Sequence, residues 1–278
     1  MIGNKFRILN DLGAGATAEV KCVEDVATGE QLACKIMRID SQGQVPEVAL
    51  AEAMIGFKIN HPNIINIRGI GRGMYDNLDG QPQIEVAYIL MENMKQGELL
   101  NVLMNSGKFS ESTARYFFKQ ILSALSYMHN TVGVCHRDLK LDNILLDENF
   151  NMKLADLGFA ISSKGHTGDG KLHSYKGTQC YMTPEQLDQR SYCGKQADLF
   201  AAAVILFMMV FEKRPFDEAK VSDPFYQLIA GNRCQMYWRQ FEKCCKASDE
   251  LKNLLQGMMQ LNPHARSSLE EVMAHPWL

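Results

Sequence analysis

The sequence has few of the features that mark secreted, membrane-spanning or nucleic-acid-binding proteins. Its eight cysteines are scattered, and none forms the C-x-x-C pair of a zinc site. No signal-peptide pattern begins the chain, so we expect reduced thiols and a cytoplasmic location. A net charge of −3 gives no sign of nucleic-acid binding, and this mild acidity suits a positively charged partner.

Long hydrophobic runs are also lacking. The most apolar stretch, Leu199–Phe211, is shorter than the roughly 20 residues that a membrane-spanning helix needs, and the charged triplet EKR follows it. We interpret the stretch as a buried central helix and expect no association with a membrane. No internal repeat or low-complexity tract is present, and 46% of the 278 residues are hydrophobic. This composition suits one large globular unit or two closely packed lobes.

Strand patterns dominate the first part of the chain. Four runs predict strands, with turn residues between them: Phe6–Leu12, Glu19–Val23, Leu32–Met37 and Val86–Met91. Between the third and the fourth run, Pro46 opens a helical pattern that continues to Ile59. Proline suits the first helical position, because the missing N–H has no partner there.

After residue 97 the character of the chain changes to mainly helical. Phe109–His129 predicts a long amphipathic helix with Ser110 as its N-cap. Short strands are expected at Ile144–Leu146 and Met152–Leu154, and a capping box near residue 268 predicts the last helix. A strand-rich part (1–91) joined by a short segment (92–96) to a helix-rich part (97–278) predicts an α+β fold with two lobes and a cleft between them.

The most informative segment is His136–Asn143, which reads HRDLKLDN. It places a carboxylate, an ammonium and a carboxamide at Asp138, Lys140 and Asn143. Phosphoryl transfer from a nucleotide needs a base near the acceptor hydroxyl, a cation on the migrating group and an oxygen ligand for Mg²⁺. The segment resembles the catalytic loop of eukaryotic protein kinases of the serine/threonine type. The resemblance assigns the first role to Asp138, the second to Lys140 and the third to Asn143.

A glycine-rich turn lies near the start of the chain, in Leu12–Val20 (LGAGATAEV). Gly13 and Gly15 have no side chains, so the backbone N–H groups there can approach phosphates closely. Ala18 stands where the kinase pattern has a third glycine. Any hairpin with two glycines looks similar, but Lys35 follows in the next strand within Leu-Ala-Cys-Lys, which looks like the family's Val-Ala-Ile-Lys. This context favours a phosphate-binding turn.

The resemblance also implies partners for Lys35, which would hold the α- and β-phosphates of ATP. Glu52, on the following helix, has the spacing of the family's glutamate that fixes this lysine. The alternative is a solvated surface glutamate, and Glu47 is the other acid nearby. Asp156, in an Asp-Leu-Gly that stands where the family usually has Asp-Phe-Gly, would bind Mg²⁺ together with Asn143.

An ATP pocket follows from the same resemblance. Adenine would lie between apolar side chains of both lobes, hydrogen-bonded to the backbone of the connecting segment, with Met91 as gatekeeper. The residues expected to bind ATP are Leu12, Gly13, Gly15, Val20, Ala33, Lys35, Met91, Glu92, Met94 and Leu145.

Residues 156–185 end in GTQCYMTPE, which is similar to the end of a kinase activation segment. Glu185 would form an ion pair with Arg266, and Asp198 would hold the catalytic loop by accepting backbone N–H bonds. Ser174 stands at the usual phosphosite, with Arg137 available to bind the phosphate. An ordinary loop serine is the alternative.

One position departs from the family. The apolar stack that joins the two lobes of active kinases would run through Gly56, Ile67, His136 and Leu157. Glycine at position 56 removes an apolar contact and weakens the helix by about 1 kcal/mol relative to alanine. We therefore expect a loosely held Glu52 helix that an upstream kinase or an activating partner helps to seat.

Together these residues predict an ATP- and Mg²⁺-dependent kinase that phosphorylates serine or threonine in proteins. Glu98 and Asp142 occupy positions where relatives that prefer basic substrates place acids, which points to the calcium/calmodulin-dependent or a related subgroup. The rival interpretations are a pseudokinase that acts as a nucleotide-binding scaffold and a small-molecule kinase of similar fold. Lys35, Asp138 and Asp156 are all present, which favours an active enzyme.

Overall fold

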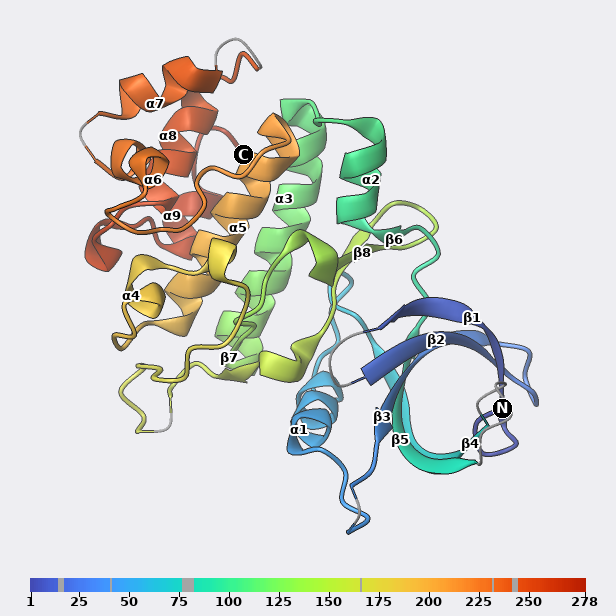
Figure 1. The fold of residues 1–278 in the computed structure, drawn as a ribbon. Helices are drawn as coiled ribbons and strands as arrows, with labels where there is room; N and C mark the ends of the chain where they lie inside the picture. Colours follow the sequence, from blue (N-terminus) through green and yellow to red (C-terminus); the bar gives the residue numbers. More distant parts are fainter. Residues whose placement is uncertain (15–17, 41, 77–82, 166, 232, 242–244) are drawn as a thin grey trace.

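The computed structural model describes the whole chain except residues 15–17, 41, 77–82, 166, 232 and 242–244. It has two lobes (Figure 1). The small lobe contains a five-stranded antiparallel sheet and helix α1, and the large lobe, from β6 onward, is mainly helical. The predicted α+β fold with two lobes is confirmed.

The strands of the small lobe follow one another in the order β1-β2-β3-β5-β4. Their bounds are β1 (Phe6–Ala14), β2 (Ala18–Asp25), β3 (Gln31–Arg38), β4 (Ile67–Tyr75) and β5 (Ile84–Glu92). Four of them confirm the predicted strands, each slightly longer than expected.

Strand β4 was not predicted, because glycine occupies three alternate positions in IRGIGRGMY and interrupts the apolar pattern. One of these glycines is needed for packing. A Cβ atom at Gly71 would lie 2.4 Å from the hydroxyl oxygen of Tyr88, whose ring covers this position from β5. The glycines therefore reflect close packing of a sheet residue rather than a loop.

Helix α1 (Glu47–Gly56) packs on one face of this sheet (Figure 1). The prediction of its start was wrong by one position, since Pro46 is the N-cap residue with an extended ψ of 130°. The helix also ends earlier than Ile59. An apolar cluster that includes Ala53 of α1 and Ile89 of β5 fills the space between helix and sheet.

The large lobe contains the remaining helices and short strands. The helices are α2 (Leu99–Ser106), α3 (Glu111–Ser126), α4 (Pro184–Leu187), α5 (Gly194–Phe211), α6 (Pro224–Ile229), α7 (Cys234–Phe241), α8 (Asp249–Met258) and α9 (Leu269–Met273). The strands are β6 (Gly97–Glu98), β7 (Val134–Cys135), β8 (Ile144–Leu146), β9 (Met152–Leu154) and β10 (Ile161–Ser162), of which β6, β8 and β9 form one small sheet.

The predicted long helix is confirmed in α3, with a difference at each end. Ser110 is its N-cap, and its hydroxyl accepts the backbone N–H of Thr113 at 3.1 Å. The helix ends at Ser126 and continues into a π-helical turn, Tyr127–Val132. The capping box of α9 is also confirmed, since Ser268 and Glu271 bond reciprocally.

The apolar run in α5 forms the centre of the large lobe. Helix α5 is long and apolar enough to cross a membrane, but 83% of it is buried inside the protein, where it packs against α3 and α8. In Figure 1 it runs through the middle of the helical lobe. This confirms the interpretation of residues 199–211 as a buried central helix.

Candidate active site

The catalytic-loop residues meet around the carboxylate of Asp138, which is buried between β7 and β8. Its Oδ2 atom lies 3.2 Å from the ammonium of Lys140 and 3.2 Å from Nδ2 of Asn143. Its Oδ1 atom accepts both the backbone N–H and the hydroxyl of Thr178, each at 3.0 Å. The structure therefore brings the three predicted groups together and adds Thr178, which orients the carboxylate from the activation segment.

Asp198 anchors this loop by accepting hydrogen bonds from its backbone, as predicted. Its two oxygens accept the backbone N–H groups of His136 and Arg137 at 2.9 and 2.8 Å, and Nε2 of His129 lies 2.7 Å away. Burial alone would raise the pKa of Asp198, but the hydrogen bonds from His129 and the loop outweigh burial and lower it. The anchored Arg137 has a φ of 70°, a conformation that non-glycine residues adopt only when their surroundings hold them.

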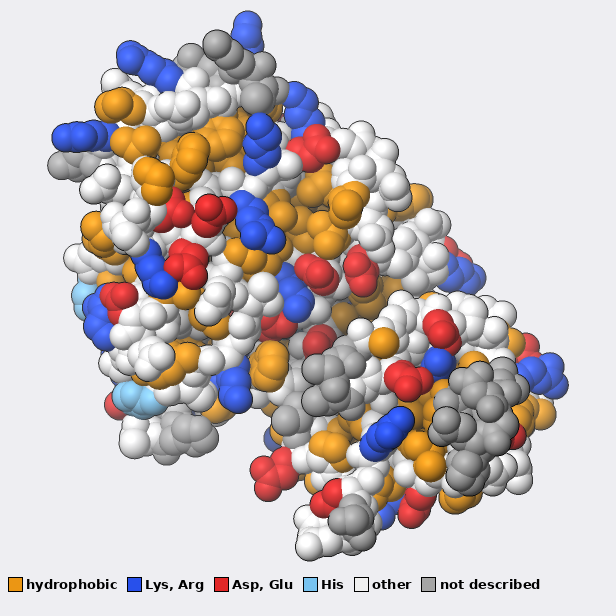
Figure 2. Space-filling model, in the orientation of Figure 1, with side chains coloured by type: hydrophobic (Ala, Val, Ile, Leu, Met, Phe, Trp, Pro, Cys, Tyr) orange, Lys and Arg blue, Asp and Glu red, His pale blue; other side chains and the backbone are white. Residues whose placement is uncertain are grey.

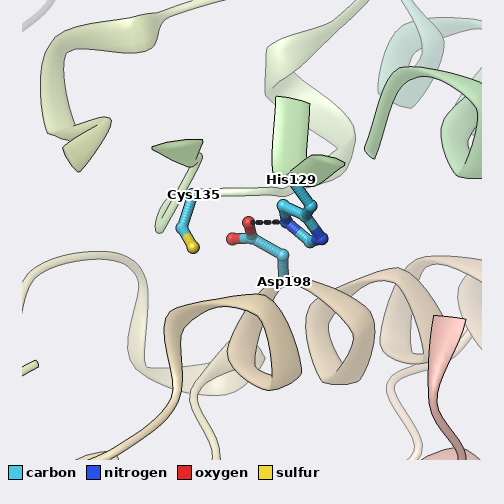
Figure 3. Close-up of side chains that lie close together, drawn as sticks. All are labelled: His129, Cys135 and Asp198. Carbon is cyan, nitrogen blue, oxygen red and sulfur yellow. Dashed lines mark hydrogen bonds and ion pairs between the residues drawn. The ribbon is translucent and has the colours of Figure 1, made fainter. Parts of the chain in front are cut away.

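His129, Cys135 and Asp198 lie close enough together to suggest a metal site (Figure 3). Two ligands of a tetrahedral zinc ion would be roughly 3.3 Å apart, given ligand distances of about 2.0 Å. The His129 and Asp198 atoms are 2.7 Å apart, which is a direct hydrogen bond. Burial, followed by the charge of Asp198, also raises the pKa of the Cys135 thiol. The cluster is therefore an anchor of the loop. His129 was not predicted from the sequence, because it lies 69 residues from its partner.

Lys35 connects the two lobes. Its ammonium, on β3, lies 2.7 Å from Glu52 of α1 and 2.9 Å from Asp156. Glu52 is only 3% exposed, so the alternative of a surface glutamate is wrong, whereas Glu47 is exposed. Burial would lower the pKa of Lys35, but the two carboxylates outweigh it, and the pKa is raised. Lys35 in turn lowers the pKa of Asp156 against the effect of burial. The charges of both groups are thus maintained.

Five side chains that were expected to contact adenine belong to one apolar cluster with residues from both lobes. Ala33, Met91 and Met94 are buried in it, and Val20 and Leu145 pack against its edge. Leu12 and Gly13 lie on β1, where Leu12 is exposed and outside this cluster. Glu92 ends β5. The expectation for Gly15 lies outside the described residues. That these side chains bind adenine stays a prediction.

The two acids expected to bind substrate lie near each other. Glu98 is on β6 and Asp142 is in the turn before β8. Burial and then the negative charge of Asp142 raise the pKa of Glu98, while Lys140 opposes them. Acidic side chains are also visible on the large lobe close to its boundary with the small lobe (Figure 2). A cation placed here would relieve the repulsion between the two carboxylates.

Ser174 lies beside the arginine that the sequence assigned to it. Its hydroxyl is 2.5 Å from Nη1 of Arg137. The same arginine donates through Nε to the carbonyl of Phe159 at 2.6 Å, and Tyr192 donates its hydroxyl to the carbonyl of Ser174 at 2.9 Å. The hydroxyl of Ser174 therefore already contacts the guanidinium of Arg137, which was expected to bind a phosphate on this serine.

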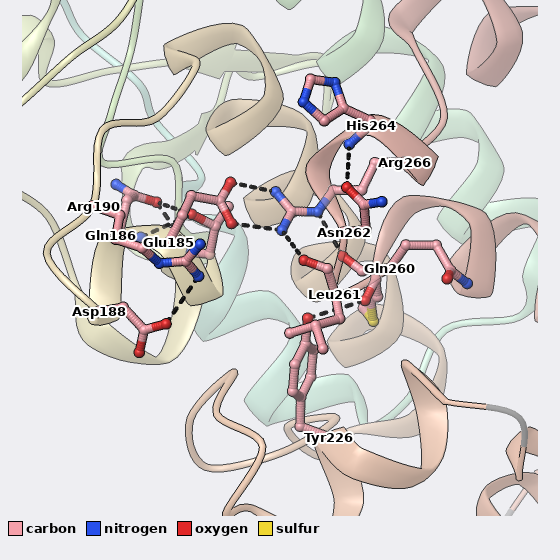
Figure 4. A network of polar contacts seen from close by, with 12 residues as sticks. Glu185, Gln186, Asp188, Arg190, Tyr226, Gln260, Leu261, Asn262, His264 and Arg266 are labelled. Atoms are coloured by element: carbon pink, nitrogen blue, oxygen red, sulfur yellow. Dashed lines mark hydrogen bonds and ion pairs between the residues drawn. The ribbon is translucent and has the colours of Figure 1, made fainter.

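The end of the activation segment is fixed by a buried ion pair (Figure 4). Arg266 binds both oxygens of Glu185, at 2.6 and 2.7 Å, and also donates to the carbonyl of Gln260 at 2.7 Å. Its guanidinium lies 5.1 Å from the ring centre of Phe200. The predicted pair is confirmed, and its atoms are saturated by protein contacts.

The space beside Gly56, where an apolar contact was expected to be missing, is filled by another side chain. A Cβ atom at this position would lie 2.1 Å from Cδ1 of Ile67, so the side chain of Ile67 already occupies the space. Helix α1 is seated, with Glu52 bound to Lys35. The side chain of Ile67, eleven positions later, thus takes the place of a side chain at position 56, and a loosely held helix stays a prediction.

This geometry defines a site suited to phosphoryl transfer from a nucleotide. Residues 6–278 match the family model described as protein kinase domain, so the chain belongs to this family. It is similar to CBL-interacting serine/threonine-protein kinase 26 of Arabidopsis thaliana, at 33% identity over 98% of this chain and 58% of the relative. Sperm motility kinase 1 of Mus musculus is 32% identical over 99% of this chain and 52% of its own length. CBL-interacting protein kinase 11 of Oryza sativa subsp. japonica is 31% identical, with 98% and 51% covered. The chain thus spans about half the length of these curated relatives.

Proposed function

We propose that the protein is an active, ATP-dependent serine/threonine protein kinase that transfers the γ-phosphoryl group to a protein hydroxyl. One observation carries this proposal. The ammonium of Lys35 contacts Glu52 and Asp156 at the same time, at 2.7 and 2.9 Å, so the groups that hold the phosphates and the metal are assembled. A pseudokinase would not require this arrangement together with a positioned Asp138.

The residues present fit Mg²⁺. Asn143 uses its amide nitrogen for hydrogen bonds to the backbone oxygen and the carboxylate of Asp138, at 2.7 and 3.2 Å, which directs its carbonyl oxygen away as a ligand. Asp156 supplies a carboxylate that is 44% exposed. Oxygen ligands of this kind suit Mg²⁺. When bound, the ion would neutralise negative charge on the phosphates.

In the proposed reaction, Asp138 orients the substrate hydroxyl and accepts its proton as the hydroxyl oxygen bonds to the γ-phosphorus. The bond between the γ-phosphorus and the bridging oxygen breaks at the same time, and ADP leaves with the electron pair of that bond. Thr178 holds one oxygen of this carboxylate, and Lys140, 3.2 Å from the other, stabilises the charge that develops on the transferred group. The protein residues thus position the hydroxyl and supply positive charge, which are the main requirements of this reaction.

We further propose that substrates carry basic residues before or near the phosphorylated serine. The raised pKa of Glu98 beside Asp142 supports this, because a substrate guanidinium would pair with both carboxylates. Ser174 is the proposed site of an upstream kinase, since Arg137 already contacts its hydroxyl. The names of two relatives refer to a CBL partner, and we propose that a partner protein also regulates this chain.

Phosphate transfer to an arginine-containing serine peptide tests the proposal, with Asp138→Asn as the matched variant. Transfer by the wild type that falls by about 10²–10⁴-fold in the variant is expected for loss of a catalytic base. A wild type that binds ATP but transfers nothing, even after Ser174 is phosphorylated, would be a scaffold. A peptide with the arginine replaced by glutamate tests the substrate preference separately.

A further inference from the structure

A cavity of about 270 Å³ lies in the large lobe, outside the candidate active site. Residues from the end of α5, from α7, from the segment between α7 and α8, and from the first turn of α8 line it. Helices α7 and α8 lie in the part of the large lobe that points away from the small lobe (Figure 1). None of the described residues that line the cavity belongs to the catalytic loop or to the nucleotide site, so the proposed function gives it no role.

Three aromatic side chains form one wall of this cavity. Phe211 of α5 and Trp238 and Phe241 of α7 are 3%, 6% and 7% exposed. The ring centre of Phe211 lies 6.0 Å from that of Trp238 and 5.4 Å from that of Phe241. Because the rings pack against one another, the wall has a fixed shape. A wall of this kind favours a flat, apolar group.

The volume limits the size of this group. An apolar cavity of about 150 Å³ holds benzene, so a cavity of about 270 Å³ has room for about ten carbon atoms. Water molecules in the same space would find few hydrogen-bond partners along the aromatic wall, and their release favours an apolar ligand. Two fused aromatic rings match both the wall and the volume.

The aromatic wall also contains an unpaired polar atom. Nε1 of Trp238 is buried and has no hydrogen-bond partner in the described part of the structure. A buried donor without an acceptor is unfavourable, and native proteins contain few of them. A ligand that carries an oxygen beside its rings can supply the missing acceptor.

Two lysines give the cavity positive charge. Lys246, between α7 and α8, is exposed and forms no hydrogen bond or ion pair with another residue that the structure describes. Lys252 of α8 contacts Asp249 at 3.1 Å, and this aspartate is 95% exposed. Two ammonium groups and one carboxylate leave a single net positive charge. This balance suits a carboxylate, whereas the greater charge of a phosphate would be repelled more strongly by Asp249.

We propose that this cavity binds a small aromatic carboxylate, with its rings against Phe211, Trp238 and Phe241 and its carboxylate beside Lys246. Binding requires an apolar body of about ten carbon atoms and one negative charge. The site is separate from the nucleotide site, so the inference does not depend on the proposed function.

The test uses 2-naphthylacetate, which has two fused rings and a carboxylate on a short arm, and the amide 2-naphthylacetamide, which has no charge. Binding of each to the full chain is measured by titration calorimetry at low ionic strength, where exposed charges are least screened. Lys246→Met removes the ammonium, and Ala247→Leu places a larger side chain in the wall of the cavity. Lys213→Met is the matched control, because Lys213 is exposed and lies two residues after Phe211 but does not line the cavity.

The wild type should bind the carboxylate with a dissociation constant of about 1 mM or lower. Lys246→Met should weaken binding of the carboxylate by about threefold to fivefold and leave binding of the amide unchanged, because only the charge interaction is lost. Ala247→Leu should weaken binding of both compounds by about tenfold or more, since the space is filled. Lys213→Met should bind both compounds as the wild type does.

Three results would overturn the proposal: no binding by the wild type, an equal loss of both compounds in Lys246→Met, or unchanged binding in Ala247→Leu. Thermal unfolding shows whether each variant is folded, and Lys246→Met, at an exposed position, tests the charge even if Ala247→Leu is unstable. Displacement of the probe by Mg·ATP would also contradict the proposal, because the probe would then occupy the nucleotide site.

Discussion

Two ion pairs in this protein have nearly the same nitrogen–oxygen distances but differ in how far their side chains are exposed to solvent. Arg266 and Glu185 lie within the large lobe, 1% and 4% exposed, and every contact is made by protein atoms. Lys35 joins Glu52 of the small lobe to Asp156, which is 44% exposed. The first pair is saturated and can only hold the chain in place. The second keeps an ammonium and a carboxylate at the surface of the cleft, where phosphate and metal can reach them.

The comparison separates stability from activity. A buried pair whose partners are satisfied contributes nothing to chemistry, and its loss leaves an uncompensated charge. An ion pair that is partly open to solvent costs less to disrupt, because water solvates the remaining group. The following four changes test this difference.

The largest effect on stability is expected from Arg266→Met. Removing the arginine leaves the carboxylate of Glu185 buried without a partner, so the free energy of unfolding should fall by about 3–5 kcal/mol. Urea unfolding measures this. Arg190→Met is the control, because Arg190 binds Asp188 at 2.9 Å with both side chains more than half exposed. A control as unstable as Arg266→Met would contradict the assignment of a structural pair.

Lys35→Met should reduce activity more strongly than stability. We expect peptide phosphorylation to fall by about 10²–10³-fold, because an electrostatic group is lost from the transition state. The free energy of unfolding should fall by less than in Arg266→Met, because Asp156 is accessible to water and the buried Glu52, whose pKa is raised by burial, can accept a proton. Lys21→Met is a matched control, because Lys21 on β2 contacts Asp11 of β1 at 2.7 Å and Glu19 of its own strand at 3.2 Å. Its phosphorylation rate should stay within about threefold of wild type.

Gly56→Ala tests how helix α1 is held. The added methyl group must displace Ile67, and overpacking of this kind costs about 1–3 kcal/mol. Activity should fall together with stability, because the shift moves Glu52 away from Lys35. Ile67→Val removes the Cδ1 atom that the new methyl group meets, so the double variant should recover part of both losses. Higher activity in Gly56→Ala would instead support a helix that lacks a packing contact.

The smallest effect concerns pH. The folded-state pKa of Asp198 lies below its ordinary value of 3.8, so the unfolded chain binds more protons at acidic pH. This contribution to stability is present above about pH 4 and is lost as the pH falls through the folded-state pKa. Unfolding free energies measured between pH 3 and 6 should therefore depend less on pH in Asp198→Asn than in the wild type. Equal slopes would contradict the lowered pKa.

The sequence predicted most of the fold because its patterns are local. Strands β8 and β9 were found at their observed bounds, and the N-cap at Ser110 was recognised from the residues beside it. Strand β4 was missed because glycines interrupt its apolar pattern, and one of them, Gly71, accommodates the ring of Tyr88 on another strand. Periodicity reports which side of an element is apolar, but it carries no information about the residues that pack against a glycine.

The candidate site likewise contains residues that the sequence predicted and contacts that it did not. Asp138, Lys140 and Asn143 could be assigned because they share one short loop that resembles the catalytic loop of protein kinases. The contact of Asp198 with the loop backbone was also predicted from the resemblance. The contacts of Thr178 with Asp138 and of His129 with Asp198, 40 and 69 positions apart, were not predicted. Such contacts depend on how helices and loops from distant parts of the chain come together.

By itself, the sequence determined the lobes, the catalytic loop and the charged groups available for phosphoryl transfer, because spacing and residue type specify these locally. Only the tertiary structure decided that Ile67 fills the space beside Gly56 and that aromatic rings of α5 and α7 line one cavity. The physical reason is that packing and electrostatic interactions act through space at distances of a few ångströms. Their partners are therefore set by the folded arrangement of the two lobes.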